Sequence, residues 1–329
     1  MAEGQRTALV VGGAGYIGSN CCKLLAQKGF LPVTYDNMVY GHPEVVKWGP
    51  LEIGDIADGA RLDEVMKRYR PEAVLHFAAF INVGESVGKP GKYYRNNVCG
   101  TISLLDAMVR NGIGRIVFSS TCATYGDPQW IPLTEDHPQA PLNPYGWSKF
   151  MVETILDDYE TAHGIRSAAL RYFNAAGADP EAETGEDHSP ETHLIPIVLD
   201  AAMGRREEVA VFGDDYDTKD GTCVRDYIHV VDLGDAHLRA LDHLAAGKES
   251  LRLNLGNGAG YTVMETIELA EQVVGKPIRR RMAERRPGDA PKLIGDASRA
   301  RRILGWNPRY GDLATIIEHA WRWHRKRFG

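Results

Sequence analysis

The sequence predicts an α/β fold in which a doubly wound parallel sheet (Rossmann) is combined with a second, smaller α/β domain. Three observations support this prediction: short apolar runs alternate with amphipathic stretches, a glycine-rich turn follows the first apolar run, and the alternation breaks after Asn174. Strand, helix, strand in this rhythm indicates parallel strands joined by right-handed crossovers.

Each expected element has a signal of its own. An uninterrupted apolar run predicts a buried strand, and apolar residues at helical spacing predict a helix. The expected strands are 7–13, 32–37, 73–79, 115–121 and 167–174. The expected helices are 17–29, which Gly29 would end, then 60–69, 97–112 and 145–163.

An acidic, loop-like stretch at 178–193 separates this pattern from a shorter and more mixed one. We therefore divide the chain into a first domain of residues 1–174 and a second domain of residues 175–329, and we expect some later segments to return to the first domain. The first domain carries the expected cofactor site, and the second carries the expected substrate site.

The composition excludes several classes of protein. The chain has 329 residues, 43% hydrophobic and 25% charged, with a net charge of −6, which is typical of a globular protein that does not bind nucleic acid. The basic segment 322–329 is expected to be a solvated helix end. No run approaches the roughly 20 apolar residues of a membrane span, so no membrane association is expected.

The cysteines indicate the compartment. There are five, without a C-x-x-C pair, which is typical of reduced thiols in a cytoplasmic protein. The same pattern gives no reason to expect a zinc site, and no metal is predicted. The segment MAEGQRTALVVGG lacks the long apolar stretch of a signal peptide, which agrees with a cytoplasmic location.

The segment GGAGYIG, residues 12–18, follows the first expected strand and opens the first helix. Gly12, Gly15 and Gly18 have a spacing that allows a tight turn, close approach of the backbone to a pyrophosphate, and close helix packing. The free N–H groups of the helix N-terminus would face the phosphates. A glycine motif alone is a weak signal, but this strand–turn–helix context makes it a strong one.

Asp36 ends the second expected strand, 18 residues after Gly18. A carboxylate there accepts hydrogen bonds from the adenosine ribose and repels a 2′-phosphate, so the expected cofactor is NAD rather than NADP. The alternative is a turn residue before Asn37. GDI (54–56) is expected against the adenine and HFAA (76–79) beside the cofactor, although a lone histidine such as His76 is more often a core residue.

Tyr145 and Lys149 lie four residues apart in NPYGWSKF, directly after Pro144, which favours a helix start. The simpler alternative is a chance pair on an amphipathic surface helix. A free tyrosine is a poor base because its pKa is about 10, but a nearby ammonium and a positive nicotinamide ring would lower that pKa. Tyr145 would then take a proton from a sugar hydroxyl while a hydride leaves the same carbon for NAD.

Thr121 ends the expected strand 115–121 and is predicted to hydrogen-bond the same sugar hydroxyl. The alternative is a strand-end hydroxyl that only caps its neighbours. The tyrosine–lysine helix that follows in the chain favours the catalytic interpretation.

The glycine turn, SSTCATYG, YGWSK, RYFN and DGTCVRDYIHV together resemble the extended short-chain dehydrogenase/reductase superfamily, and most closely its UDP-glucose 4-epimerase family. The similarity extends from Val10 to about Trp323, and DGTCVRDYIHV and GRREEVAVFGDDY are more specific than any glycine motif. The resemblance implies that hydride leaves C4 of a UDP-hexose for NAD, that the 4-keto sugar rotates, and that hydride returns to the opposite face. UDP-glucose and UDP-galactose would thereby be interconverted.

The resemblance also implies roles for individual residues. Tyr145 is the base, Lys149 lowers its pKa and holds the nicotinamide ribose, and Thr121, where the family commonly has serine, aids proton movement. The implied NAD contacts, besides these three, are Gly12, Gly15, Tyr16, Ile17, Gly18, Asp36, Asn37, Asp55, Ile56, Phe77, Ala78, Ala79, Asn96 and Phe173. The implied contacts with the UDP-sugar are Asn174, His193, Leu194, Ala210, Phe212, Arg225, Tyr227, Arg286 and Asp289.

Two positions depart from the family pattern and a third bears on the sugar. Ile81 stands where relatives carry a lysine near the cofactor, and His193 stands where an asparagine often meets the diphosphate. Leu293, of intermediate size, neither excludes nor favours an N-acetylated sugar. Plant UDP-xylose/arabinose epimerases share SSTCATYG and NPYG, so a pentose substrate is an alternative, as are UDP-N-acetylhexosamines. For Arg225 and Arg286, the alternative to pairing with a diphosphate is surface solubility.

Two rival functions fit the sequence less well. A nucleotide-sugar 4,6-dehydratase usually has an Asp-Glu pair after the catalytic threonine, where this chain has Cys122 and Ala123. A non-catalytic NAD-sensing protein would need neither Tyr145 nor Lys149. In the superfamily, two long helices such as 97–111 and 145–163 often form an intersubunit four-helix bundle, so a homodimer is expected.

Overall fold

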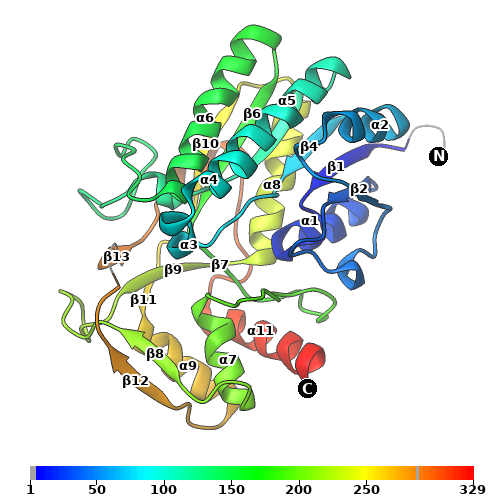
Figure 1. Ribbon diagram of the computed structural model, residues 1–329. Coiled ribbons are helices and arrows are strands. Elements are labelled where there is room, and N and C mark those ends of the chain that lie inside the picture. Colours follow the sequence, from blue (N-terminus) through cyan, green and yellow to red (C-terminus); the bar gives the residue numbers. More distant parts are fainter. Residues whose placement is uncertain (1–4, 287–288) are drawn as a thin grey trace.

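A seven-stranded parallel sheet, covered by helices on both faces, organises the chain (Figure 1). The computed structural model describes residues 5–286 and 289–329. From one edge to the other, the strands are β10 (Leu251–Leu255), β6 (Arg166–Tyr172), β5 (Arg115–Thr121), β4 (Ala73–His76), β1 (Thr7–Val11), β2 (Leu31–Asp36) and β3 (Leu51–Ile53). All six neighbouring pairs are parallel, which confirms the predicted doubly wound sheet.

Two apolar cores lie on opposite faces of this sheet. Successive residues of β1 alternate between them: Ala8 and Val10 face one core, and Leu9 and Val11 face the other. The first core is covered by α1 (Tyr16–Gln27), α8 (Val230–Ala245) and α10 (Ser298–Leu304). The second core is covered by α2 (Gly59–Tyr69), α5 (Gly100–Arg110) and α6 (Pro144–His163).

The strand order reverses between β1 and β4, since the chain runs outward to β2 and β3 before it returns. In open α/β sheets a crevice forms at such a reversal, outside the carboxyl ends of the strands. The loops that follow β1, β2, β4 and β5 therefore surround the position expected for the cofactor.

A smaller sheet begins where the first strand pattern ends. It contains β7 (Asn174–Ala176), β9 (Val224–His229), β11 (Gly260–Thr262) and β13 (Lys292–Leu293). A separate parallel pair is formed by β8 (Val209–Phe212) and β12 (Arg280–Ala283). A third core packs these strands against α7 (Leu194–Met203), α9 (Val263–Val274) and α11 (Leu313–Phe328), below the large sheet in Figure 1.

Short elements complete the connections. They are η1 (Pro43–Val45), α3 (Val83–Gly88), α4 (Pro90–Tyr93), η2 (Tyr94–Cys99) and η3 (Cys122–Thr124). Within residues 5–286 and 289–329, none of the helices combines the length and the apolar character that a bilayer crossing requires. All five cysteines carry free thiols.

The predicted elements are present, with differences at their ends. The expected helix 97–112 is preceded by continuous helical backbone from Pro90, and the expected strand 167–174 divides into β6 and β7. The strand expected at 73–79 ends at His76, because the backbone N–H groups of Phe77 and Ala78 both turn to the carbonyl oxygen of Val11. The pattern missed two strands of the large sheet, β3 and β10, and β3 has only three residues, too few to show a period.

Candidate active site

The glycine turn connects β1 to α1, as the sequence predicts. Gly12 has a φ of +83°, and a Cβ on it would lie 2.5 Å from the backbone nitrogen of Ala78. A Cβ on Gly18 would lie 2.2 Å from the carbonyl oxygen of Gly12. Gly12 is therefore required by the turn and its neighbour strand, and Gly18 by the close packing of helix against turn.

Gly15 has a different reason to be glycine. A Cβ on it would meet only the carbonyl oxygen of Gly12, at the ordinary contact distance of 3.4 Å, so the fold itself has room for a side chain there. Gly15 is also the N-cap of α1, and among the described residues no side chain caps this helix. An open helix N-terminus with a bare backbone fits a dinucleotide pyrophosphate.

Asp36 lies at the end of β2 and faces the glycine turn. Its carboxylate accepts hydrogen bonds from the backbone N–H of Ala14, at 3.1 Å, and of Met38, at 2.9 Å. Burial raises the pKa of Asp36, although these two hydrogen bonds oppose the change. The carboxylate is thus fixed beside the turn, where the ribose of a dinucleotide is expected.

The neighbouring loop is organised around Asp55. The side-chain amide of Asn37 donates to its carboxylate at 2.9 Å, and the hydroxyl of Tyr35 donates to its carbonyl oxygen at 2.8 Å. Ile56 is buried next to them. The structure therefore brings together the residues that the sequence assigned to the adenosine side of the cofactor.

Tyr16 is an expected cofactor contact, but its side chain interacts with another part of the protein. Its hydroxyl donates to the carbonyl oxygen of Gly177 at 2.7 Å, and its ring lies edge-on to that of His188. The side chain therefore joins α1 to the loop after β7.

The N-terminus of α6 has the predicted start signals. Asn143 caps the helix by accepting a hydrogen bond from the backbone N–H of Gly146, at 2.9 Å, and Pro144 occupies the first helical position. A Cβ on Gly146 would lie 2.6 Å from the carbonyl oxygen of Ala123. Glycine at this position allows α6 to approach the turn after β5 closely, which brings Tyr145 beside Thr121.

Thr121 and Tyr145 interact directly. Hydrogen bonding with Thr121 lowers the pKa of Tyr145, but burial has the larger effect and raises it to about 12. The Thr121 hydroxyl also accepts a hydrogen bond from the backbone N–H of Ala123 at 3.2 Å. Thr121 is therefore both a local cap and a partner of the tyrosine, so the two alternatives for this residue are compatible.

Lys149 lies one helical turn after Tyr145 and is buried. Its side-chain nitrogen donates a hydrogen bond to the carbonyl oxygen of Ser119 at 2.8 Å. Burial lowers the pKa of Lys149 to about 7, although the carboxylate of Glu153 opposes this shift. The expected lowering of the tyrosine pKa is not found among the protein's own groups, because burial disfavours the charged form of both side chains.

Asn97 is a site residue that the sequence analysis missed. Its side-chain amide donates to the carbonyl oxygen of Phe80 and to the hydroxyl of Ser148, both at 3.0 Å, and it accepts the backbone N–H of Phe80 at 2.9 Å. Asn97 thereby ties the loop after β4 to α6, directly before Lys149. Asn96, the predicted cofactor contact, donates to the side chain of Asn97 at 2.9 Å.

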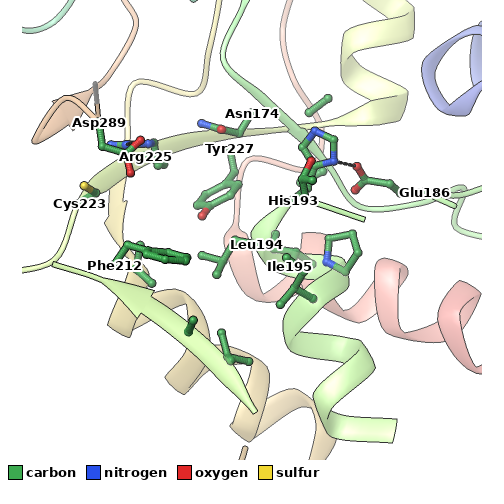
Figure 2. Close-up of a pocket in the computed structure, with 18 of the residues that line it drawn as sticks. Asn174, Glu186, His193, Leu194, Ile195, Phe212, Cys223, Arg225, Tyr227 and Asp289 are labelled. Carbon is green, nitrogen blue, oxygen red and sulfur yellow. Dashed lines mark ion pairs between the residues drawn. The ribbon is translucent and has the colours of Figure 1, made fainter. Parts of the chain in front are cut away.

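A cleft of about 900 Å³, open solvent included, lies between α7, β8 and β9 (Figure 2). All nine residues that the resemblance assigned to the substrate line it: Asn174, His193, Leu194, Ala210, Phe212, Arg225, Tyr227, Arg286 and Asp289. Thr121 at the end of β5 pairs in register with Tyr172, two residues before Asn174. The cleft therefore opens close to Tyr145 and Thr121.

Two arginines define one end of the cleft. Arg225 donates to the carbonyl oxygen of Ala290 at 2.9 Å and lies 3.5 Å from the carboxylate of Asp289. Arg286 donates to the same carboxylate at 3.0 Å, and its guanidinium lies 4.8 Å from the ring centre of Phe212. Positive charge beside an aromatic face suits a nucleoside diphosphate.

His193 and Glu186 lie at the other end of the cleft (Figure 2). Nδ1 of His193 is 2.8 Å from Oε1 of Glu186 and 2.9 Å from Oε1 of Glu191. Burial lowers the pKa of His193, but the negative charges and hydrogen bonds of the two glutamates outweigh it and raise the pKa well above its usual value. Glu186 was missed from sequence; the signal that could have found it is the spacing E-x-H-x-x-E-x-H over residues 186–193.

Three other positions discussed from sequence have clear places. Phe173 is buried with Tyr125 and Leu133, and Leu293 packs against this cluster. Ile81 is exposed. Leu293 thus belongs to the wall behind Phe173, next to the expected sugar position.

A family model described as GDP-mannose 4,6 dehydratase matches residues 9–318 of the chain. The UDP-glucose 4-epimerase of Rhizobium meliloti (strain 1021) is 59% identical over 319 residues, which cover 97% of this chain and 97% of that protein.

Solved structures agree with this similarity. The crystal structure of UDP-glucose 4-epimerase from Brucella ovis in complex with NAD has 51% sequence identity and a TM-score of 0.94, and the match covers 96% of this chain and 98% of that chain. The crystal structure of UDP-glucose 4-epimerase from Bifidobacterium longum in complex with NAD+ and UDP has 39% identity and a TM-score of 0.93, with 97% and 98% covered.

Proposed function

The chain belongs to the extended short-chain dehydrogenase/reductase family described by that model and, within it, to the UDP-glucose 4-epimerases, and from this premise we propose how its residues perform the reaction. It is an isomerase that interconverts UDP-glucose and UDP-galactose with NAD, by removal and return of a hydride at C4 through a 4-keto sugar. The observation that supports the assignment of residues is that Tyr145 and Lys149 lie on α6 beside the carboxyl end of β5, at the same edge of the parallel sheet as the glycine turn.

The proton steps belong to Tyr145 and Thr121. When NAD is bound, it supplies the acceptor and then the donor of the C4 hydride, and a positive charge beside the phenol. Tyr145 takes the proton of the C4 hydroxyl as the C4–H bond breaks, and it returns that proton to the oxygen when the opposite face is reduced. Thr121 is hydrogen-bonded to the phenol and holds the hydroxyl in line during both transfers.

Lys149 is proposed to position the cofactor and to stabilise the ionised tyrosine. One of its three N–H groups is used by Ser119, which fixes the nitrogen under the first turn of α6. The other two are free to bind the nicotinamide ribose. Its positive charge, together with that of a bound nicotinamide ring, would favour the tyrosinate against the effect of burial on the pKa of Tyr145.

The cleft binds the UDP part of the substrate. Arg225 and Arg286 pair with the diphosphate, Phe212 lies against the uracil side, and the N-terminus of α7 at Leu194 presents backbone N–H groups. The sugar has to turn over between the two hydride steps, so tight binding is reserved for UDP. The apolar wall of Tyr125, Phe173 and Leu293 suits a ring that rotates.

The family model is described as a dehydratase, but the residues after Thr121 are Cys122 and Ala123. The pKa of the Cys122 thiol is raised to about 12 by burial, so it is a poor acid–base group, and alanine has no titratable side chain. These residues support epimerisation over removal of water.

Three further properties are proposals. The substrate domain comprises residues 175–329 except α8, β10 and α10, which pack on the NAD-binding domain. The protein forms a homodimer through α5 and α6, because Trp147 and Met151 expose apolar side chains one turn apart on α6. It acts in the cytoplasm, a location supported by its five free thiols.

The proposal is tested by incubating the protein with UDP-galactose and measuring UDP-glucose. Tyr145→Phe is expected to lower kcat by about 100-fold or more, the usual contribution of a general acid–base group. Asp158→Asn, an exposed change farther along the same helix, serves as the control. Activity of Tyr145→Phe within a few-fold of the wild type would exclude Tyr145 as the base; parallel incubations with UDP-xylose and UDP-N-acetylgalactosamine test the alternative substrates.

A further inference from the structure

Four side chains that take no part in the proposed proton transfers meet beside the cleft. They are Glu186, His188, Glu191 and His193, and one potential ligand atom from each lies within 4.8 Å of all the others. They come from a single loop between β7 and α7. Their pattern, E-x-H-x-x-E-x-H, holds two imidazoles and two carboxylates within eight residues.

Two of the distances within this cluster match the edges of a coordination tetrahedron. Nδ1 of His193 lies 2.8 Å from Glu186 and 2.9 Å from Glu191, and Nδ1 of His188 lies 3.3 Å from Glu186 and 3.5 Å from Glu191. Zinc bonds to histidine nitrogen and carboxylate oxygen are about 2.0–2.2 Å, so neighbouring ligand atoms lie about 3.4 Å apart. The two separations from His188 lie close to that value, whereas the two from His193 are shorter, at hydrogen-bond length, and Glu191 offers a different oxygen to each histidine.

His188 provides an independent observation. Its Nδ1 is buried and has no hydrogen-bond partner among the described residues, although two carboxylates lie within 3.5 Å. A buried ring nitrogen is normally satisfied by a hydrogen bond. A nitrogen that faces two carboxylates without a hydrogen bond to either is placed as a metal ligand is.

The backbone that carries the ligands is held from outside. The carbonyl oxygen of Glu186 accepts from the indole of Trp323 at 3.4 Å, and the carboxylate of Asp187 accepts from Arg327 at 2.8 Å. His42 lies 3.0 Å from the carbonyl oxygen of Asp187. Such outer contacts orient the ligands of a metal site before the metal arrives.

A second acidic cluster in the same loop is occupied by the ammonium group of a lysine and serves as a comparison. Asp179, Glu181 and Glu183 surround the side-chain nitrogen of Lys23 at 2.8, 2.6 and 2.6 Å. That lysine neutralises one of their three negative charges. In the other cluster, the carboxylates of Glu186 and Glu191 face two histidines instead of a lysine. Neutral imidazole is a metal ligand, whereas an ammonium group is not.

We propose that Glu186, His188, Glu191 and His193 bind one divalent transition-metal ion, of which zinc fits the donor set best. Two neutral imidazoles and two carboxylates complete a tetrahedron and balance the charge of the ion. A closed set of four protein ligands is typical of a structural site, so the ion does not enter the epimerase chemistry.

The position of the site indicates what the metal stabilises. His193 is the N-cap of α7 and lines the substrate cleft, while the ring of His188 lies against Tyr16 at the start of α1. A metal there would fix the loop between the cofactor helix and the N-terminus of α7. Loss of the metal should therefore raise the KM for UDP-galactose more than it lowers kcat, an effect that rests on the proposed function, whereas metal binding itself does not.

The test measures metal directly. The full-length protein is stripped with a chelator, dialysed, supplied with Zn²⁺, freed of excess metal and analysed by inductively coupled plasma mass spectrometry. One zinc per chain is expected, with a higher thermal midpoint than the stripped protein. In a parallel sample, Co²⁺ should give the intense visible absorption of a tetrahedral site.

Variants identify the ligands. His188→Ala and Glu191→Gln are each expected to weaken zinc binding by about 100-fold or more, whereas Glu181→Gln, an exposed glutamate of the same loop, should bind zinc as the wild type does. If His188→Ala does not fold, the Co²⁺ spectrum of the wild-type protein decides. The proposal would be overturned if the stripped wild-type protein takes up no zinc or gives no tetrahedral Co²⁺ spectrum. It would also be overturned if both variants bind zinc as tightly as the wild type does. The loop would then be held by protonated histidines alone.

Discussion

The side-chain nitrogen of Lys149 donates to the carbonyl oxygen of Ser119 at 2.8 Å, which joins the first turns of α6 to the end of β5. Tyr145 lies one turn before the lysine, and Thr121 lies two residues after the serine. This buried hydrogen bond, together with that from Ser120 of β5 to Glu153 of α6, joins the two elements that carry the proposed base and its proposed hydroxyl partner. The arrangement accounts for a lysine that is retained in an unfavourable, buried position.

Lys149→Met is expected to lower kcat for UDP-galactose by about 100-fold or more, because the charge that favours the tyrosinate is lost. The KM should change little, since other residues line the UDP cleft. Steady-state kinetics on protein with a measured nicotinamide content provide the test, and Lys248→Met, an exposed lysine, is the control. An unchanged kcat would show that Lys149 only positions α6.

Gly15→Ala separates cofactor binding from folding. A Cβ at this position meets nothing closer than 3.4 Å, so the thermal midpoint should stay close to that of the wild type. The methyl group would instead occupy the space of the pyrophosphate, and NAD should bind roughly tenfold more weakly or worse, about 1.4 kcal/mol. Nicotinamide released from denatured protein and titration with NAD measure this effect.

Two other glycine variants serve as controls for this experiment. Gly18→Ala should destabilise the protein as well, because its Cβ would lie 2.2 Å from the carbonyl oxygen of Gly12. Gly88→Ala, with no atom within 4 Å of the added Cβ, should behave as the wild type. A Gly15→Ala protein that retains its full complement of NAD would mean that the turn does not contact the pyrophosphate.

The sequence predicts the large sheet well because its signals are local. Each buried strand is an apolar run, Gly12 and Gly18 mark a turn that admits no other residue, and Pro144 marks the start of α6. The smaller domain gives weaker signals, because its strands are short and pair with partners far away in the chain. Examples are β8 with β12 and β9 with β13. The return of β10 to the edge of the large sheet follows from tertiary pairing with β6 and has no local signal.

The site shows the same division between local spacing and tertiary environment. The spacing of Tyr145 and Lys149 places both on one face of α6, but the direction of a pKa shift depends on burial, which spacing does not contain. Asn97 could not be found from sequence, since its partners Phe80 and Ser148 lie in separate segments. Glu186 lies in an acidic stretch, and its contact with His193 depends on the folding of the loop, which composition does not show.

Asp226 should make stability depend on pH between about 4 and 6. Burial raises the pKa of this carboxyl from 3.8 to about 6, although three backbone N–H groups, from Asn257, Gly258 and Gly295, donate to it. The folded state then binds the proton more tightly than the unfolded chain. The associated stability is fully present below pH 3.8 and is lost as the pH rises through 6, a difference on the order of 3 kcal/mol.

Denaturant unfolding of wild type and Asp226→Asn at several pH values tests this prediction. The variant is expected to be less stable throughout, because an amide cannot accept all three hydrogen bonds, but to lack the decrease between pH 4 and 6. Asp127→Asn, an exposed position, should keep the wild-type profile. Parallel profiles for wild type and Asp226→Asn would mean that the carboxyl is already ionised in the folded protein at low pH.

The proposed homodimer can be tested through its apolar surface. Trp147 and Met151 expose apolar side chains on α6, and α3, which contacts α6 beside the proposed α5–α6 interface, exposes Val83 and Val87. Burial of such a patch against a second copy is favourable by about 25 cal/mol per Å². Light scattering should give the mass of a dimer, and a Trp147→Glu/Met151→Glu double variant should give a monomer, because two carboxylates would be buried at the interface without partners.

Met282→Glu is the matched control for this experiment, since Met282 is equally exposed but lies on β12 in the other domain. It should remain a dimer. Tyr145 and Trp147 both lie in the first turn of α6. The monomeric variant is therefore also expected to have a lower kcat, because Tyr145 would be held less firmly. A monomeric wild-type protein, or a double variant that stays dimeric, would place the interface elsewhere or remove it altogether.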